Sequence, residues 1–269
     1  MITSPPQSPP RWQGAVLYPA ALLLIFLGSQ SLLAVMGVPS DQRATIAAIP
    51  ALAALLITLP MRLRRVWHAD RPWQQLGVQR PLIQPLLRGI VKAAVLLLFL
   101  ECGLGLAGAV HWQPALSMGL VANAIALALG VGFAEELLFR GWLLGELEFL
   151  LGRQKALLVQ AAIFSLAHTR FNLPILELVG LLGGLFLLGL ALALQRRADG
   201  GALWGAVGLH GGLVGGWFLL QSGVLPVDAS APAWLMGPDN PIGGVLGWVG
   251  LSLFLILRRR WWQCTQSSQ

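Results

Sequence analysis

The sequence predicts an all-α integral membrane protein, a polytopic bundle of about eight transmembrane helices with both termini cytoplasmic. Three observations lead to this fold class. Only 11% of the 269 residues are charged and 56% are hydrophobic, whereas soluble domains carry about 25% charged residues. Apolar runs of about 20 residues, long enough to cross a bilayer as a helix, recur along the whole chain. Basic residues gather in alternate connections between these runs.

The predicted elements follow one another with short connections. A Pro- and Ser-rich tail at 1–14 comes first and is expected to be disordered. Apolar runs then predict helices at about 15–37, 44–60, 90–109, 119–150, 155–171, 174–195, 201–221 and 241–257. These runs divide the chain into N-terminal helices at 15–114 with a basic cytoplasmic loop at 61–89, a core at 115–221, a last loop and helix at 222–260, and a tail at 261–269.

The distribution of Lys and Arg predicts the orientation. With the N-terminus inside, the inner segments hold 15 of the 18 basic residues, and the outer segments hold only Arg43 and Arg170. The net charge of +7 therefore reflects membrane topology, and we expect no nucleic-acid partner. The two cysteines, Cys102 and Cys264, indicate neither a disulfide framework nor a zinc ribbon.

The fourth run contains charges at a depth where a bilayer disfavours them. In "EELLFR", Glu136 and Arg140 are four residues apart with the acid first, the favourable order for an ion pair on one helix face. Glu135 points about 100° away from Glu136, which leaves it as the less compensated carboxylate. Nearer the inner end of the run, Glu146 and Glu148 are expected to protrude and to be merely solvated.

Two further runs each contain a histidine. His168 follows Phe164 by one helical turn in the fifth run, and His210 lies among glycines in the seventh. A lone histidine in a span is commonly a packing residue. At 1.5 Å of rise per residue, however, Glu135, His168 and His210 all lie roughly 14–22 Å from the inner ends of their runs. The three side chains are therefore expected to meet in a buried polar site.

A glutamate and two histidines can carry out hydrolysis in two ways. They can hold a divalent metal as a His₂Glu set that leaves a position open for water. Alternatively, the glutamate and one histidine activate water directly while the other histidine stabilises an oxyanion. The chain has no H-E-x-x-H motif, no G-x-S-x-G motif and no membrane aspartyl pair, so other hydrolytic mechanisms lack candidate residues.

Three short motifs in order resemble one known family. E-E-x-x-x-R at Glu135–Arg140, F-x-x-x-H at Phe164–His168 and a later histidine at His210 are similar to those of the CPBP intramembrane proteases. That family includes the type II CAAX prenyl endopeptidases and bacteriocin-processing proteins. The resemblance covers roughly residues 115–220 and implies an eight-helix membrane bundle whose cavity opens toward the cytosol, in a bacterial plasma membrane. It also implies a peptide or lipidated-protein substrate, with membrane lipids as surroundings.

The resemblance also implies residue roles. Glu135 and His168 would activate the attacking water, Glu136 and Arg140 would support the motif, and His210 would contribute to the oxyanion site. In the metalloprotease description of the family, Glu135, His168 and His210 would instead hold one divalent metal, zinc.

One position departs from the family pattern. The third motif often has a polar residue one turn after its histidine, where this chain has Val214. Losing one oxyanion donor can cost a few kcal/mol of transition-state stabilisation. Asn172, one turn after His168, is a candidate substitute, although "NLP" is also typical of a helix end.

Two other functions compete with proteolysis. Val214 favours a non-catalytic scaffold or immunity protein that retains the fold. Buried Glu and His also occur in the relays of proton-coupled transporters, but no repeated halves or broken helix pairs support that hypothesis.

Overall fold

The computed structural model describes residues 11–228, 230–237 and 240–257. Within these ranges the chain is helical and has no β-strand, only an isolated bridge between Val110 and Val227. The predicted all-α membrane bundle is confirmed. The expected tail at 261–269 and most of the expected tail at 1–14 lie outside the described residues.

The helices have the following bounds: α1 (Trp12–Val35), α2 (Ser40–Val66), α3 (Pro72–Gln75), α4 (Ile83–Leu106), α5 (Met118–Glu136), η1 (Leu137–Leu143), α6 (Leu144–Leu151), α7 (Arg153–Leu166), α8 (Ile175–Ala198), α9 (Trp204–Gly223), α10 (Ala233–Met236), η2 (Pro241–Gly243) and α11 (Val245–Leu257). In the described part of the chain, five stretches are long and apolar enough to cross a membrane: α1, most of α2, α4, the continuous stretch Met118–Leu151, and α8.

The remaining three predicted spans correspond to α7, α9 and α11. Helix α7 has 14 residues and α11 has 13 in the described part of the chain. An α-helix of that length rises about 20 Å, less than the roughly 30 Å hydrocarbon core. Helix α9 has 20 residues, many of them glycine, and is not among the stretches that are long and apolar enough to cross a membrane. The count of eight spans and the side of the termini therefore stay predictions.

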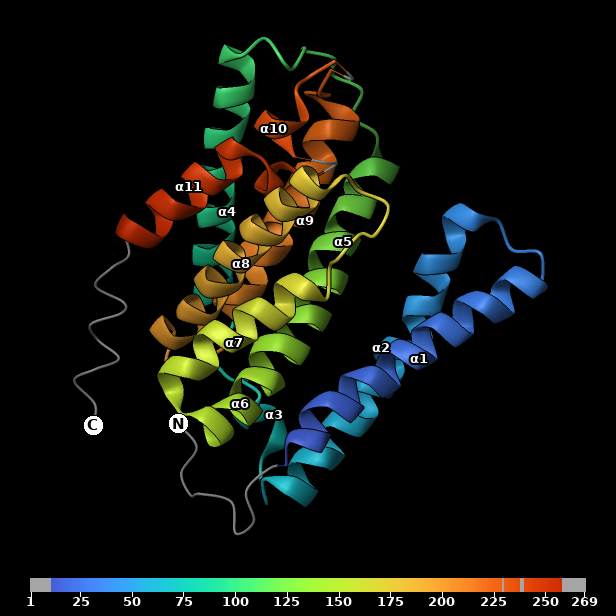
Figure 1. The fold of residues 1–269 in the computed structure, drawn as a ribbon, viewed down its shortest axis with the longest axis vertical. Helices are drawn as coiled ribbons and strands as arrows, with labels where there is room; N and C mark the ends of the chain where they lie inside the picture. Colours follow the sequence, from blue (N-terminus) through green and yellow to red (C-terminus); the bar gives the residue numbers. More distant parts are fainter. Residues whose placement is uncertain (1–10, 229, 238–239, 258–269) are drawn as a thin grey trace.

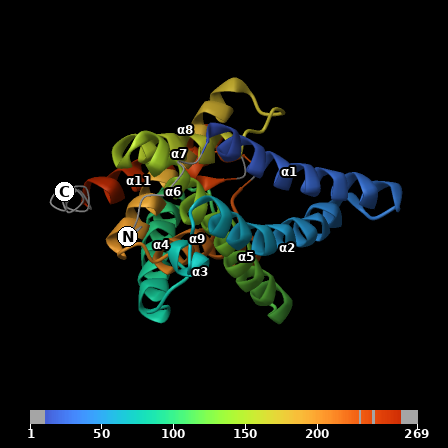
Figure 2. The ribbon, with the colours of Figure 1, turned by 90° about the horizontal axis from the view of Figure 1, so that it is seen from below.

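Helix α9 forms the centre of the bundle, with α4 and α5 packed along it (Figure 1). Helix α8 packs against α7 and α11, and α6 folds back on α7. The α1–α2 hairpin leans away from these helices and meets them near α3 and α6, as both views show (Figures 1 and 2).

The hairpin is attached to the bundle through buried contacts at one end. Tyr18 on α1 packs edge-on against Trp142, with the ring centroids 4.9 Å apart. On α2, Leu59 and Leu63 are fully buried. Glu146 on α6 is also fully buried and forms an ion pair with Arg62 of the hairpin.

The prediction that Glu146 is merely solvated is therefore wrong. Its carboxylate accepts hydrogen bonds from Arg62 and from Trp67 Nε1, the latter at 2.6 Å. The sequence places Glu146 at a helix end beyond the bilayer, but the hairpin, distant in sequence, covers that end and supplies the opposite charge. Glu148 is only partly exposed and pairs with Arg197 at 2.9 Å, so it is not simply solvated either.

The helix predicted at 119–150 is present but is not regular. It begins at Met118, where the Ser117 hydroxyl accepts a hydrogen bond from the Leu120 N–H and caps the first turn. Residues Leu137–Leu143 form a π-helix, a widened segment that often occurs at functional sites. The guanidinium of Arg196 on α8 donates to the backbone carbonyls of Arg140 and Gly141 within it. This side chain therefore helps to satisfy the widened backbone.

Candidate active site

The predicted site residues come from four neighbouring segments of the bundle. Glu135 and Glu136 end α5, Arg140 lies in η1, His168 follows the end of α7 by two residues, and His210 lies in α9. The polar site is therefore formed where the π segment begins.

Two glycines allow the backbones of α5 and α9 to approach closely next to the site residues. A Cβ added to Gly132 would lie 2.8 Å from the Cα of Gly211 and 3.0 Å from its N atom. Gly132 precedes Glu136 by one turn, and Gly211 directly follows His210. Because neither position carries a side chain, the two backbones approach closely enough to bring the glutamates against His210.

Glu135 faces both histidines. Its Oε2 atom lies 3.4 Å from His168 Nε2 and 3.9 Å from His210 Nε2. The side chains of Glu135 and His168 remain 27% and 33% exposed, whereas that of His210 is 6% exposed. The site thus combines a buried histidine with a carboxylate and a second histidine that a reactant can reach.

Glu136 connects the arginine to the second histidine. Its Oε1 atom accepts a hydrogen bond from Arg140 Nη1 at 2.7 Å and lies 2.9 Å from His210 Nδ1. Glu136 and Arg140 are both completely buried. The predicted ion pair is confirmed, and the structure adds its contact with His210, which sequence spacing does not reveal.

Phe164 lies between the charged groups. Its ring centroid is 4.8 Å from that of His168 and 5.8 Å from that of His210. The Arg140 guanidinium carbon stacks 4.0 Å from the same centroid, and Phe139 packs edge-on at 5.1 Å. Phe164 therefore fixes the positions of both imidazoles and covers the buried arginine.

Hydrogen bonds to Nδ1 set the tautomers of the two histidines. His168 Nδ1 lies 2.8 Å from the carbonyl oxygen of Phe164. A carbonyl only accepts, so Nδ1 carries a proton, and Nε2 is the nitrogen that faces Glu135. His210 Nδ1 likewise donates to Glu136, which leaves its Nε2 directed toward the site.

Several buried polar atoms in this region have no hydrogen-bond partner within the described residues. They are Glu135 Oε2, Glu136 Oε2, Arg140 Nε and Nη2, and Trp142 Nε1. Buried polar atoms in folded proteins are nearly always satisfied by protein or water. The site is therefore suited to hold water or the polar part of a reactant.

Two more residues were considered from the sequence: Val214, the departure from the third motif, and Asn172, the candidate substitute donor. Asn172 is exposed in the connection between α7 and α8, and no hydrogen bond joins it to Glu135, His168 or His210 in the described part of the chain. Val214 is half-buried on α9, one turn after His210. The supporting role of Asn172 stays a prediction.

The donor types of a zinc site are present. Both histidines donate Nδ1–H to an oxygen, as metal-bound histidines commonly do, and turn Nε2 toward a carboxylate. No group of three or more His, Cys, Asp or Glu side chains that could hold a metal ion is found among the described residues. A zinc ion held by Glu135, His168 and His210 therefore stays a prediction.

The sequence did not single out Gly132, Phe139 or Arg196 as site residues. The pairing of Gly132 with Gly211 depends on the register between α5 and α9, and the contact of Arg196 depends on the π segment. The only sequence signal was the glycine-rich character of 211–216, which indicates close helix packing without naming a partner. Two cavities, of about 1390 and 740 Å³, lie elsewhere, and neither is lined by Glu135, His168 or His210.

The fold and the site together define an integral membrane protein with a buried glutamate–histidine centre, a combination suited to hydrolysis of a peptide bond. Residues 117–215 match the family model described as type II CAAX prenyl endopeptidase Rce1-like, as the resemblance to the CPBP proteases predicted. Residues 2–71 match a model described as a domain of unknown function, DUF8676. No curated protein and no solved structure matches this chain. The family match coincides with the core predicted at 115–221 and contains every predicted site residue.

Proposed function

We propose that this protein is an intramembrane endopeptidase in which Glu135 and His168 activate water and His210 supports the oxyanion. One observation carries the proposal: the buried Oε2 atom of Glu135, which has no hydrogen-bond partner within the described residues, lies 3.4 and 3.9 Å from the Nε2 atoms of two histidines that come from two other segments. The Rce1-like family supports endopeptidase function for the domain as a whole.

The water is activated between two acceptors. Its two hydrogens are shared with Glu135 Oε2 and His168 Nε2, which are 3.4 Å apart, and its lone pair is directed at the scissile carbonyl carbon. As the oxygen–carbon bond forms, one proton passes to this pair of acceptors. The same proton then moves to the leaving nitrogen, the oxyanion re-forms the carbonyl, and the carbon–nitrogen bond breaks. The products are a carboxylic acid and an amine, and transfer of the second water proton between them gives a carboxylate and an ammonium group.

The oxyanion needs a donor on the opposite side of the carbonyl. His210 is suited to this role because Glu136 fixes its Nδ1 and leaves Nε2 directed into the site. Because Nδ1 donates to Glu136, Nε2 can donate to an oxyanion only when the imidazole ring carries both protons.

The family match and the membrane surroundings support a proposal for the substrate class. We propose that the substrate is a peptide held at the membrane, either a lipidated protein end or a transmembrane segment, cleaved near the cytosolic side. The pattern of basic residues supports this orientation, and the CAAX prenyl endopeptidase match supports a prenylated peptide as the first substrate to test.

The direct test uses a fluorogenic farnesylated CAAX peptide with purified protein in proteoliposomes. We expect cleavage by the wild type and a loss of about 10³-fold in kcat for Glu135→Gln and His168→Ala. The controls Glu177→Gln and His111→Ala change the same residue types outside the site and should retain activity. If the wild type cleaves neither this peptide nor a transmembrane peptide library, the non-catalytic alternative replaces the proposal.

The metal prediction is tested on the same preparations. Metal analysis of wild type, His168→Ala and His210→Ala protein separates the two hydrolytic routes. Activity in protein that contains no stoichiometric metal supports the direct route. Two results together would contradict the direct route. The wild type would hold one zinc per chain that both variants lose, and its activity would be lost on chelation and restored by zinc.

A further inference from the structure

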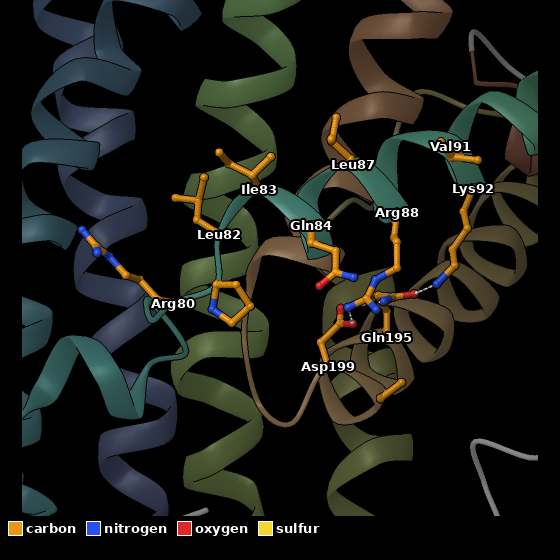
Figure 3. A pocket seen from close by; sticks show the side chains of 12 residues that line it. Arg80, Leu82, Ile83, Gln84, Leu87, Arg88, Val91, Lys92, Gln195 and Asp199 are labelled. Carbon is orange, nitrogen blue, oxygen red and sulfur yellow. Dashed lines mark hydrogen bonds and ion pairs between the residues drawn. The ribbon is translucent and has the colours of Figure 1, made fainter.

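A second polar site lies between the start of α4 and the end of α8. It is the cavity of about 1390 Å³, and its lining includes cationic and apolar side chains from these two helix ends (Figure 3). None of the residues assigned to hydrolysis lines it. The hydrolytic proposal does not account for this cavity.

The floor of the cavity is a chain of hydrogen bonds. Arg88 Nη2 donates to Asp199 Oδ1 at 2.9 Å, and Gln195 Nε2 donates to Asp199 Oδ2 at 2.6 Å. Lys92 Nζ donates to Gln195 Oε1 at 2.5 Å. The Asp199 side chain is only 4% exposed, whereas that of Arg88 is 50% exposed. Both carboxylate oxygens of Asp199 therefore already accept hydrogen bonds, whereas Arg88 keeps N–H donors for another acceptor.

The charge of the cavity favours an anion. Three cationic side chains, Arg80, Arg88 and Lys92, line it together with a single carboxylate, Asp199. Arg80 is exposed at the other end of the cavity and forms no ion pair within the described residues. Three positive charges and one negative charge leave the residues that line the cavity with a net charge of +2.

The wall of the cavity is apolar and lies at a membrane boundary. Ile83, Leu87 and Val91 recur every four residues on α4, and each is more than half exposed. In Figure 3 these side chains point away from the polar floor, on which Arg88 and Lys92 lie. Both α4 and α8 are long enough to cross a membrane, and the cavity lies where one begins and the other ends. Lipid headgroups occupy this level of a bilayer.

We propose that this cavity binds one anionic phospholipid. The lipid phosphate lies against Arg88 and Lys92, Arg80 adds attraction for a negative headgroup, and an acyl chain runs along the apolar stripe of α4. The combination favours a lipid over a soluble anion, because a soluble anion would leave the exposed apolar stripe unused. Basic pockets between transmembrane helices are suited to anionic lipid headgroups.

The test measures lipid binding by native mass spectrometry of the full chain in an uncharged detergent. Phosphatidylglycerol and phosphatidylcholine with identical acyl chains are compared. We expect tighter binding of phosphatidylglycerol, and a loss of about fivefold in its affinity for each of Arg80→Gln and Arg88→Gln. Arg65→Gln, an exposed arginine at the end of α2 that does not line the cavity, should bind like the wild type.

Arg80→Gln alone suffices if Arg88→Gln does not fold, since Arg80 is exposed and has no ion-pair partner in the described residues. Leu87→Asn should weaken phosphatidylglycerol binding without changing any weak binding of inorganic phosphate. Equal binding of the two lipids, an unchanged preference in the arginine variants, or inorganic phosphate bound as tightly as the lipid would overturn the proposal. None of these readouts depends on peptidase activity.

Discussion

The buried pair Arg62–Glu146 should determine how firmly the α1–α2 hairpin is attached to the bundle. Glu146 is fully buried, and Arg62 is 19% exposed. Arg62→Met leaves a buried carboxylate with only the hydrogen bond from Trp67 Nε1. Removing one partner of a buried ion pair costs about 3–5 kcal/mol, a large part of a typical unfolding free energy.

The double variant Arg62→Met/Glu146→Leu removes both charges together. Its cost should be about 1–3 kcal/mol, mainly from the unsatisfied Trp67 N–H, so the two single substitutions should be strongly non-additive. The assay is unfolding of the purified protein by a denaturing detergent, followed by helical circular dichroism. If Arg62→Met changes the free energy of unfolding by less than about 0.5 kcal/mol, or if the two substitutions are strictly additive, the ion pair does not hold the hairpin to the bundle.

Three further predictions concern the surroundings of the site. Val214→Asn introduces a polar group one turn after His210. It should raise kcat about tenfold while lowering the melting temperature slightly. An unchanged kcat would show that this position provides no oxyanion donor. Gly132→Ala should lower kcat by about 10²-fold, because its Cβ would lie 2.8 Å from the Gly211 Cα. Gly130→Ala is the control, since a Cβ there meets nothing within 4 Å, and equal activity of the two variants would contradict the close-approach argument. Arg196→Gln removes donors to the Arg140 and Gln75 carbonyls and should lower the free energy of unfolding in detergent by about 2–4 kcal/mol. The control Arg64→Gln, at an exposed arginine, should lower it by less than about 0.5 kcal/mol. Comparable losses in the two variants would show that Arg196 does not support the π segment.

Local spacing predicted the features that depend on a single helix. Glu136 and Arg140 are one turn apart, so their pairing follows from sequence. The all-helical class and the apolar stretches follow from composition and run length. The approach of Glu135 to His168 and His210 was expected from the similar depths of the three residues, and the structure brings them together.

Features that depend on two distant segments could not be predicted in this way. The burial of Glu146 depends on Arg62 and Trp67, 84 and 79 residues earlier in the chain. The π segment depends on tertiary support, because Arg196 on α8 satisfies carbonyls within it. Periodicity describes a regular helix, so it gives no sign of a widened turn. The contact between Glu136 and His210 likewise requires the register that Gly132 and Gly211 set.

We propose that the two adjacent glutamates have different tasks, hydrolysis for Glu135 and structural support for Glu136. The most direct measurement compares Glu135→Gln with Glu136→Gln in the farnesyl-peptide assay and in detergent unfolding. We predict that Glu135→Gln lowers kcat about 10³-fold with an unchanged unfolding free energy. Glu136→Gln should cost about 3–5 kcal/mol of stability, since Arg140 is then buried without its counter-charge. Substantial activity in Glu135→Gln, or equal stability losses in the two variants, would contradict this account.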